Sequence, residues 1–233
     1  QTGAREGETY TFTLVPETYS YRIQRKGYKS IRGTVTMDGT EKTIAAEWTA
    51  LTAWDGSGAG RFSGGTRPAA DPYQIESGEE LAYLSKLAAD KTAVNDAYYV
   101  LTADIDLNNK PFTPIGVDSS HSFRGTFDGA GHVISNLKVE VTESAKFAGL
   151  FGHANVIAKD LTIDTASVTS VSINTGVLVG GLYSSGSATN CVVKNAAVTG
   201  TGTVGGLIGI AEKVASPALI ENCVNTGNMT SPT

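Results

Sequence analysis

The chain has 233 residues and 27 of them are glycine, about 12% of the chain against an average of about 7%. Apolar residues make up 40% and charged residues 18%, which is too apolar and too weakly charged for a disordered protein. No apolar run approaches the roughly 18 residues of a membrane span. The net charge of −5 argues against nucleic acid as a partner, because that ligand requires a concentrated basic surface.

Residues 1–52 are predicted to form a small antiparallel β-sandwich-like domain. Residues 8–15 alternate apolar side chains with threonines, the period of a half-buried strand. Asp38-Gly39 stands between the strand-like segments 34–37 and 43–46, which predicts a hairpin. So few strands make a thin sheet, so we expect a further strand from beyond Gln1 or packing onto the rest of the chain.

A glycine-rich connector is expected over residues 53–70, where Trp54 and Phe62 favour packing over free movement. A helix is expected at about residues 78–89 because its leucines recur at helical spacing. Ser77 and Glu80 have the spacing of a capping box. We expect this helix to cover the N-terminal end of the repetitive region that begins after it.

Residues 71–233 contain an internal repeat of 24 to 32 residues, in which a glycine-leucine motif is followed by a second strand-like segment. A repeat of this length is too small to bury its own apolar face, so consecutive units must stack. The predicted fold is all-β, a right-handed parallel β-helix (solenoid) with the helix at its N-terminal end.

Two inward-facing walls are predicted from equivalent positions in the repeat. The residues expected on the first wall are Gly149, Leu150, Gly152, Gly180, Gly181, Leu182, Gly205, Gly206, Leu207 and Gly209. Those expected on the second are Leu137, Leu161, Cys191 and Cys223, preceded by Asn136, Asp160, Asn190 and Asn222. Side chains of the Asn and Asp type can cap backbone groups at a corner.

The glycine motif resembles the core of the GLUG-motif family, Gly-Leu-any-Gly. Gly149–Gly152 and Gly206–Gly209 match that core, whereas the middle copy, Gly181–Ser184, ends in serine. Segments before the repeats, such as Phe123–Gly129, are similar to those preceding GLUG repeats in bacterial surface proteins. The resemblance implies an adhesin-like protein or a non-catalytic region of an IgA-cleaving metallopeptidase, and it implies no catalytic residues.

Three acidic residues, Asp104, Asp106 and Asp128, are the first candidates for chemistry, because β-helical enzymes use paired carboxylates as acid and base or to hold calcium. Asp104 and Asp106 alternate with Ile105 and Leu107, so they share the outward face of one strand. Asp128 precedes a glycine turn. We interpret them as a solvated polar face and a turn residue.

The histidines and cysteines have structural interpretations as well. His121, His132 and His153 lack metal-ligand spacing and lie by glycine-rich turns, so we interpret them as loop histidines. Cys191 and Cys223 could form a disulfide between coils or stack as buried thiols. The thiols are favoured because residues in register fit the disulfide torsion poorly.

The predicted function is that of a non-catalytic structural or adhesive module of a secreted or cell-surface bacterial protein, with a host protein or glycan as partner. The prediction includes no cofactor, no metal and a monomer cut from a longer extracellular chain. The alternatives are a carbohydrate-active β-helical enzyme and a spacer region of a large surface peptidase. Residues 149–201 contain few charged side chains for catalysis: Lys159, Asp160, Asp164 and Lys194.

Residues 54–233 should fold without residues 1–50, because the solenoid buries its own core. Far-UV circular dichroism and a thermal melt of the truncated chain would test this. A cooperative transition close to that of the full chain is expected. A chain without β-signal or transition would contradict the two-domain division.

Overall fold

The computed structural model describes residues 4–6, 9–11, 14–23, 25, 28–29, 31–91, 95–143, 146–171, 174–212 and 219–230. The chain divides into two compact units, residues 1–51 and 52–233. Among the described residues, none of the helices has the length and apolar character needed to span a bilayer.

Unit 1 is built from antiparallel strand pairs. In its described part β1 (Ala4–Glu6) pairs with β2 (Thr9–Thr11), and β3 (Thr18–Ile23) pairs with β4 (Ile31–Thr36). The strand expected at 43–46 is absent, so the predicted hairpin around Asp38 is wrong. The Asp38 carboxylate accepts hydrogen bonds from Thr40 and Lys42, and this side-chain turn replaces a ladder of backbone bonds.

Unit 2 is a succession of short strands with a helix near its beginning. Its described elements are β5 (Tyr73–Ile75), α1 (Gly78–Ala89), β6 (Ala97–Leu101), β7 (Ile105–Asp106), the 3-10 helix η1 (Ser119–His121), β8 (Phe123–Asp128), β9 (Val133–Val141), β10 (Phe151–Lys159), β11 (Thr162–Ser170), β12 (Asn174–Gly176), β13 (Val179–Tyr183), β14 (Ser187–Thr189), β15 (Val192–Gly200), β16 (Thr203–Gly205), β17 (Ile208–Glu212), β18 (Leu219–Glu221), β19 (Val224–Asn225) and β20 (Asn228–Thr230).

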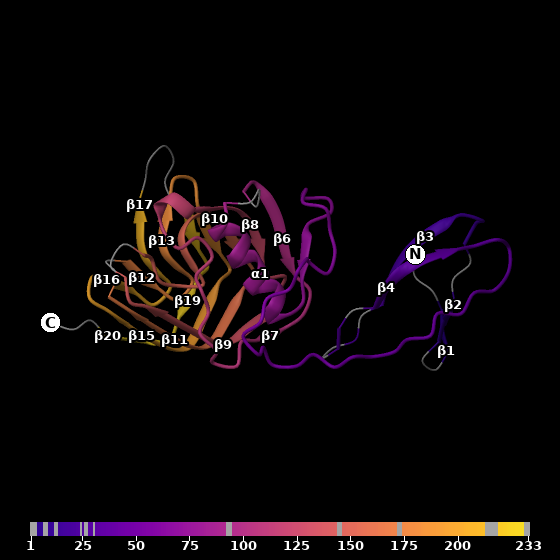
Figure 1. Cartoon of the computed structure of the whole chain (residues 1–233), viewed down its shortest axis with the longest axis horizontal. Helices are drawn as coiled ribbons and strands as arrows, with labels where there is room; N and C mark the ends of the chain where they lie inside the picture. The colour runs from indigo at the N-terminus through magenta and orange to yellow at the C-terminus, as the bar shows by residue number, and fades with distance from the viewer. Residues whose placement is uncertain are drawn as a thin grey trace. The chain divides into compact units, whose positions relative to one another are not determined.

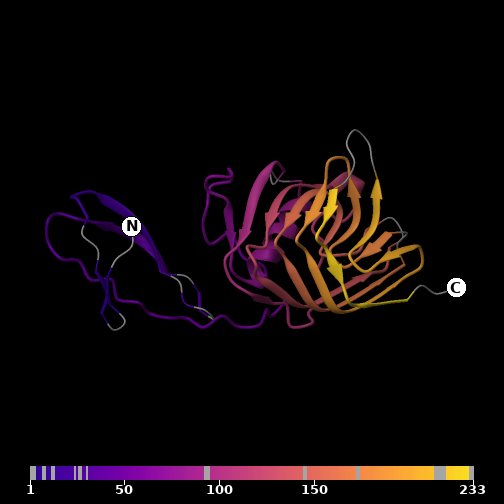
Figure 2. The same cartoon turned by 180° about the vertical axis from the view of Figure 1, so that it is seen from behind.

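The strands of unit 2 form three walls. Wall 1 has the order β5, β6, β8, β10, β13 and β17, with β14 and β18 continuing its later coils. Wall 2 has the order β7, β9, β11, β15 and β19, with β20 beside β15, and wall 3 pairs β12 with β16. Every pairing in these walls is parallel. Unit 2 is therefore a parallel β-solenoid of about 5 turns (Figures 1 and 2), as predicted.

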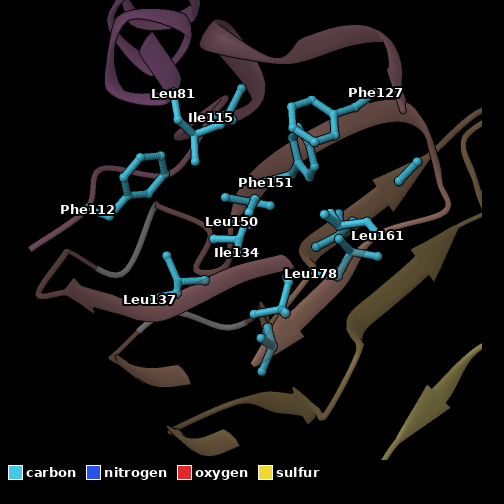
Figure 3. Packing of buried hydrophobic residues seen from close by; sticks show 14 of the residues in the cluster. Leu81, Phe112, Ile115, Phe127, Ile134, Leu137, Leu150, Phe151, Leu161 and Leu178 are labelled. Atoms are coloured by element: carbon cyan, nitrogen blue, oxygen red, sulfur yellow. The ribbon is translucent and has the colours of Figure 1, made fainter. Parts of the chain in front are cut away.

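The interior is filled by ladders that repeat one position from coil to coil. On wall 2, Ile105, Ile134, Ile163 and Val193 lie in register, each at most 2% exposed. Figure 3 shows Ile134, Leu150 and Leu178 directed into this interior. Because an apolar side chain gains about 1.5–3 kcal/mol on full burial, each coil depends on its neighbours for stability.

Helix α1 covers the N-terminal end of the solenoid (Figure 1). It connects β5 to β6, and Leu81 and Leu84 are completely buried in the core. Ser85 Oγ donates to the Thr113 carbonyl at 2.7 Å. The predicted capping box forms only in part: Ser77 is the N-cap without a side-chain bond, and Glu80 Oε2 accepts from the Glu76 N–H at 2.7 Å.

The glycine-rich segment 53–70 is packed against the first coil. The backbone N–H of Trp54 donates to the Asp106 carbonyl at 2.8 Å, and the indole ring packs edge-on against Phe112. Phe62 contacts the ring of Tyr99 in β6. These contacts explain why a segment with so many glycines belongs to the solenoid unit.

The strand register corrects one position of the repeat. Leu182 lies opposite Ala154 and Ala211, so its predicted equivalence with Leu150 and Leu207 is wrong. Phe151 pairs with Val179, and Val179 pairs with Ile208, so Leu178 is the residue equivalent to Leu150 and Leu207. The intervals between these three leucines are 28 and 29 residues. Ser184, which ended the predicted middle motif, lies outside the corrected one. Leu178 and Leu182 both lie near glycines and both are buried, so composition could not separate them.

Glycine recurs where neighbouring coils approach most closely. Gly152, Gly180 and Gly209 directly follow the paired residues of three consecutive coils. A Cβ on Gly152 would lie 2.3 Å from the Gly116 carbonyl oxygen, and one on Gly209 would lie 2.5 Å from that of Gly180. The excess glycine therefore permits tight stacking of backbones.

Gly152→Ala should destabilise the protein by about 1–3 kcal/mol, because the methyl group would have to displace the Gly116 backbone of the preceding coil. Gly58→Ala is the matched control, since a Cβ there meets nothing within 4 Å, and it should stay within about 0.5 kcal/mol of wild type. Urea unfolding midpoints would measure both. Equal effects of the two substitutions would contradict the close-approach explanation.

Candidate functional site

Amide side chains connect successive coils at the corner between walls 1 and 2. Asp160, Asn190 and Asn222 have φ values of 52°, 53° and 52°, a left-handed conformation that Asn and Asp tolerate best among non-glycine residues. Asn190 Nδ2 donates to Asp160 Oδ1 at 2.9 Å, and Asn222 Nδ2 donates to Asn190 Oδ1 at 3.4 Å. The same residues turn the chain and join the coils.

A second corner of the same kind lies within wall 2. Asn136, Thr165 and Asn195 have φ values of 56°, 57° and 51°. Asn136 Nδ2 donates to Asp106 Oδ1 at 2.8 Å, and Asn195 Nδ2 donates to Asp164 Oδ1 at 2.9 Å. Asn136 therefore belongs to this corner and not to the one that contains Asp160.

The corrected position of Asn136 in the repeat also changes the position of Leu137. It lies opposite Ala166, which lies opposite Ala196, so its predicted alignment with Leu161 is wrong. Leu161, Cys191 and Cys223 each directly precede residues that pair across consecutive coils. Two left-handed corners, most of them formed by Asn or Asp, thus recur along the coils, and only the register assigns Asn136 to one of them.

The predicted acidic candidates each bond to a different partner. Asp104 Oδ1 lies 3.0 Å from His132 Nδ1, Asp106 accepts from Asn136, and Asp128 forms an ion pair with Lys159. In the part of the chain that the structure describes, no group of three or more His, Cys, Asp or Glu side chains is placed to hold a metal ion. These carboxylates link coils instead of converging on one point.

The three histidines are separated in the same way. His121 is the last residue of η1, and its Nδ1 lies 2.7 Å from Oδ1 of Asp118. His132 comes directly after a turn and contacts Asp104. His153 lies inside strand β10, so its interpretation as a loop histidine is wrong. The glycines before it form the close-packed wall and not a loop.

His153 belongs to a cluster of three aromatic rings on the outer side of wall 1, here called the ring cluster: Phe147, His153 and Tyr183. The His153 and Tyr183 rings are stacked, with centroids 4.1 Å apart and an interplanar angle of 14°. Phe147 packs edge-on against His153 at 5.0 Å. Gly181 lies opposite His153, and a Cβ there would be 2.6 Å from the Tyr183 ring, so this glycine leaves room for the stack.

Polar groups surround the ring cluster. Ser122 Oγ lies 2.9 Å from His153 Nδ1, and Lys146 Nζ lies 3.2 Å from Asp118 Oδ2. Burial lowers the pKa of His153, which favours the neutral imidazole. Burial raises the pKa of Asp118, but hydrogen bonds from His121 and Lys146 outweigh it and bring that pKa to about 2.

Burial also raises the pKa of the Tyr183 phenol, and Glu212 adds to the effect. The cluster therefore presents a neutral phenol and a neutral imidazole, with the Lys146–Asp118 ion pair and the carboxylate of Glu212 nearby. Sequence reasoning singled out neither Phe147 nor Tyr183, because single aromatic residues far apart in the chain form no motif.

The two cysteines are free thiols. Cys191 is buried and Cys223 is half-buried. Cys191 Sγ donates to the Thr189 carbonyl and Cys223 Sγ to the Ala188 carbonyl, each at 3.3 Å. Burial raises the pKa of Cys191 to about 12, so this thiol is protonated and unreactive at neutral pH.

Comparison with known proteins finds a sequence relative and a structural neighbour. No family model matches the chain. Halomucin of Haloquadratum walsbyi is 37% identical over 154 residues, covering 60% of this chain but only 2% of that protein. A crystal structure from Bacteroides ovatus, provisionally assigned as an immunoglobulin A1 protease, has a TM-score of 0.49 at 17% identity and covers 73% of this chain and 70% of its own.

Asn190→Ala should destabilise the protein by about 1 kcal/mol more than Asn190→Gly. Both remove the bond to Asp160, but only alanine adds the strain of the left-handed backbone, which costs about 1–2 kcal/mol. Chemical denaturation of the two variants measures the difference. Glycine being equal to or worse than alanine would contradict a role for this conformation.

Asp118→Asn should reduce stability at pH 7 and have less effect at low pH. The pKa of Asp118 is about 2 in the folded chain, below its ordinary value of 3.8, so its stabilising contribution is present above about pH 4 and is lost as the pH falls toward 2. Urea midpoints of wild type and variant between pH 7 and pH 2.5 would converge. A difference that does not change with pH would contradict this role for the carboxylate.

Proposed function

We propose that the chain is a non-catalytic structural and adhesive module of a secreted or cell-surface bacterial protein. The observation that carries the proposal is the use of its polar side chains: carboxylates and amides on the outside of the solenoid bond to the neighbouring coil. Asp164 illustrates this, because it accepts from Asn195 and pairs with Lys194 at 3.2 Å. Side chains used in this way hold neighbouring coils of the solenoid together and make it stiff.

The match to Halomucin supports a modular role. The chain spans about 2% of that protein's length, so the related segment there is a small part of a very long polypeptide. The extracellular location and the GLUG family rest on the sequence resemblance, which implies bacterial surface proteins. A spacer in a large surface peptidase is the second candidate, favoured by the same cross-coil bonding, and it differs in having no partner of its own.

A carbohydrate-active enzyme is less well supported. Glycoside cleavage by the usual route needs two carboxylates that flank one bond, about 5–10 Å apart. Asp104, Asp106 and Asp128 are instead each engaged with a different partner.

A two-part assay of the full chain tests the proposal. We expect no new reducing ends when the chain is incubated with a panel of plant, bacterial and host polysaccharides. We expect saturable binding to at least one member of an array of host glycans and extracellular-matrix proteins. Turnover of any polysaccharide would overturn the non-catalytic function, and absence of all binding would leave the spacer and overturn the adhesive part.

A further inference from the structure

We propose that the outer face of wall 1 is a binding surface for a neutral glycan, centred on the ring cluster. This inference rests on the proposed adhesive function and assigns it a location and a ligand class. Three features of that face carry it: the ring cluster, a row of exposed apolar side chains, and polar groups of both hydrogen-bonding kinds between them.

The row crosses the coils on the same face as the ring cluster, and its apolar side chains alternate with the hydroxyls of Thr126 and Ser187. Tyr98 and Ile157 are both in register with Thr126, and Leu219 continues the row through Ser187. Tyr98 is 39% exposed, Ile157 43% and Leu219 53%. Large apolar side chains grouped on one face mark an interaction site more often than scattered ones do.

The second row carries the polar groups. Asn155 pairs with Arg124 and stands next to Ala154, whose partner Leu182 precedes Tyr183. Asn155 Oδ1 is shielded from solvent and has no hydrogen-bond partner in the described part of the chain. An amide acceptor left unpaired retains capacity for a further donor, and Asn155 lies on the outward side of β10 between His153 and Ile157.

The charged side chains near the ring cluster form no positive patch. Arg124 Nε donates to Asp96 Oδ1 at 2.6 Å, and Lys146 pairs with Asp118. The exposed carboxylate of Glu212 lies opposite Tyr183. A face without excess positive charge does not attract an acidic ligand, which favours a neutral glycan over a sulfated or sialylated one.

A pyranose ring combines the two kinds of contact that this face provides. Its C–H groups form apolar faces that pack on aromatic rings such as Tyr183, and its hydroxyls both donate and accept. Neutral His153 and Ser122 supply both functions at the edge of the stack. Because coils repeat at about 4.8 Å, the face is extended along the solenoid axis and can contact several sugar units of a linear chain.

Isothermal titration calorimetry on the full chain tests the proposal, with cellohexaose, mannohexaose, chitohexaose and a sialylated biantennary glycan as probes. We expect at least one neutral hexasaccharide to bind more tightly than the sialylated glycan. Tyr183→Ala should weaken that binding about tenfold, the upper range of one aromatic contact. Tyr183→Phe, which keeps the ring, should stay within about threefold of wild type.

Val171→Ala is the matched control, since Val171 is an exposed apolar residue directly after β11 on wall 2 and is 46% exposed. It should leave binding unchanged. Circular dichroism and thermal melts would verify that every variant is folded. If Tyr183→Ala fails to fold, Ile157→Ala on the exposed row replaces it, with an expected loss of about threefold.

The possible results separate this inference from the proposed function. Neutral-glycan binding that survives both Tyr183→Ala and Ile157→Ala would overturn the location and leave the adhesive module intact. Binding to the sialylated glycan alone, or to a matrix protein alone, would overturn the ligand class. Cleavage of a probe would overturn the proposed non-catalytic function itself.

Discussion

Parallel pairing between consecutive coils is the constraint on which the rest of this structure depends. A single coil of about 30 residues exposes its apolar side chains above and below, and it becomes stable only when the next coil covers them. The in-register ladder of Ile105, Ile134, Ile163 and Val193 is the result. At the N-terminal end, Leu81 and Leu84 of helix α1 belong to the same buried core.

The same constraint determines where the unusual residues stand. Backbones that stack this closely leave no space for a Cβ at Gly152 or Gly209, so glycine accumulates at one position per coil. Sharp corners require left-handed backbone, and Asn190 supplies it while its amide bonds to Asp160. A glycine content that would suggest flexibility in another protein is found here in a tightly packed solenoid.

The surface proposed to bind a ligand is also a product of stacking. His153 and Tyr183 come from neighbouring coils, and their rings meet because Gly181 lies opposite His153 and leaves room for them. Side chains on such a face have fixed spacing, since the walls that hold them are continuous sheets. A fixed face that combines aromatic rings, apolar side chains and hydrogen-bonding groups, and that has no positive patch, is the physical basis for proposing a linear neutral glycan.

The sequence predicted the features that depend on the spacing of residues along the chain. The repeat length, the strand content, the helix at 78–89 and the ladder through Leu161, Cys191 and Cys223 were predictable from spacing and alternation in one strand or one helix. The glycine-leucine motif likewise predicted stacked coils without any knowledge of their partners.

Features that depend on which residue lies opposite which were decided by the tertiary structure. Leu178 and Leu182 are both buried leucines near glycines, and only the register places Leu178 beside Leu150. Asn136 could serve either of two similar corners, and the pairing of β9 with β11 selects one. The ring cluster has no sequence signature, because its stacked rings belong to different coils and their contact arises only when coils of slightly different length come into register.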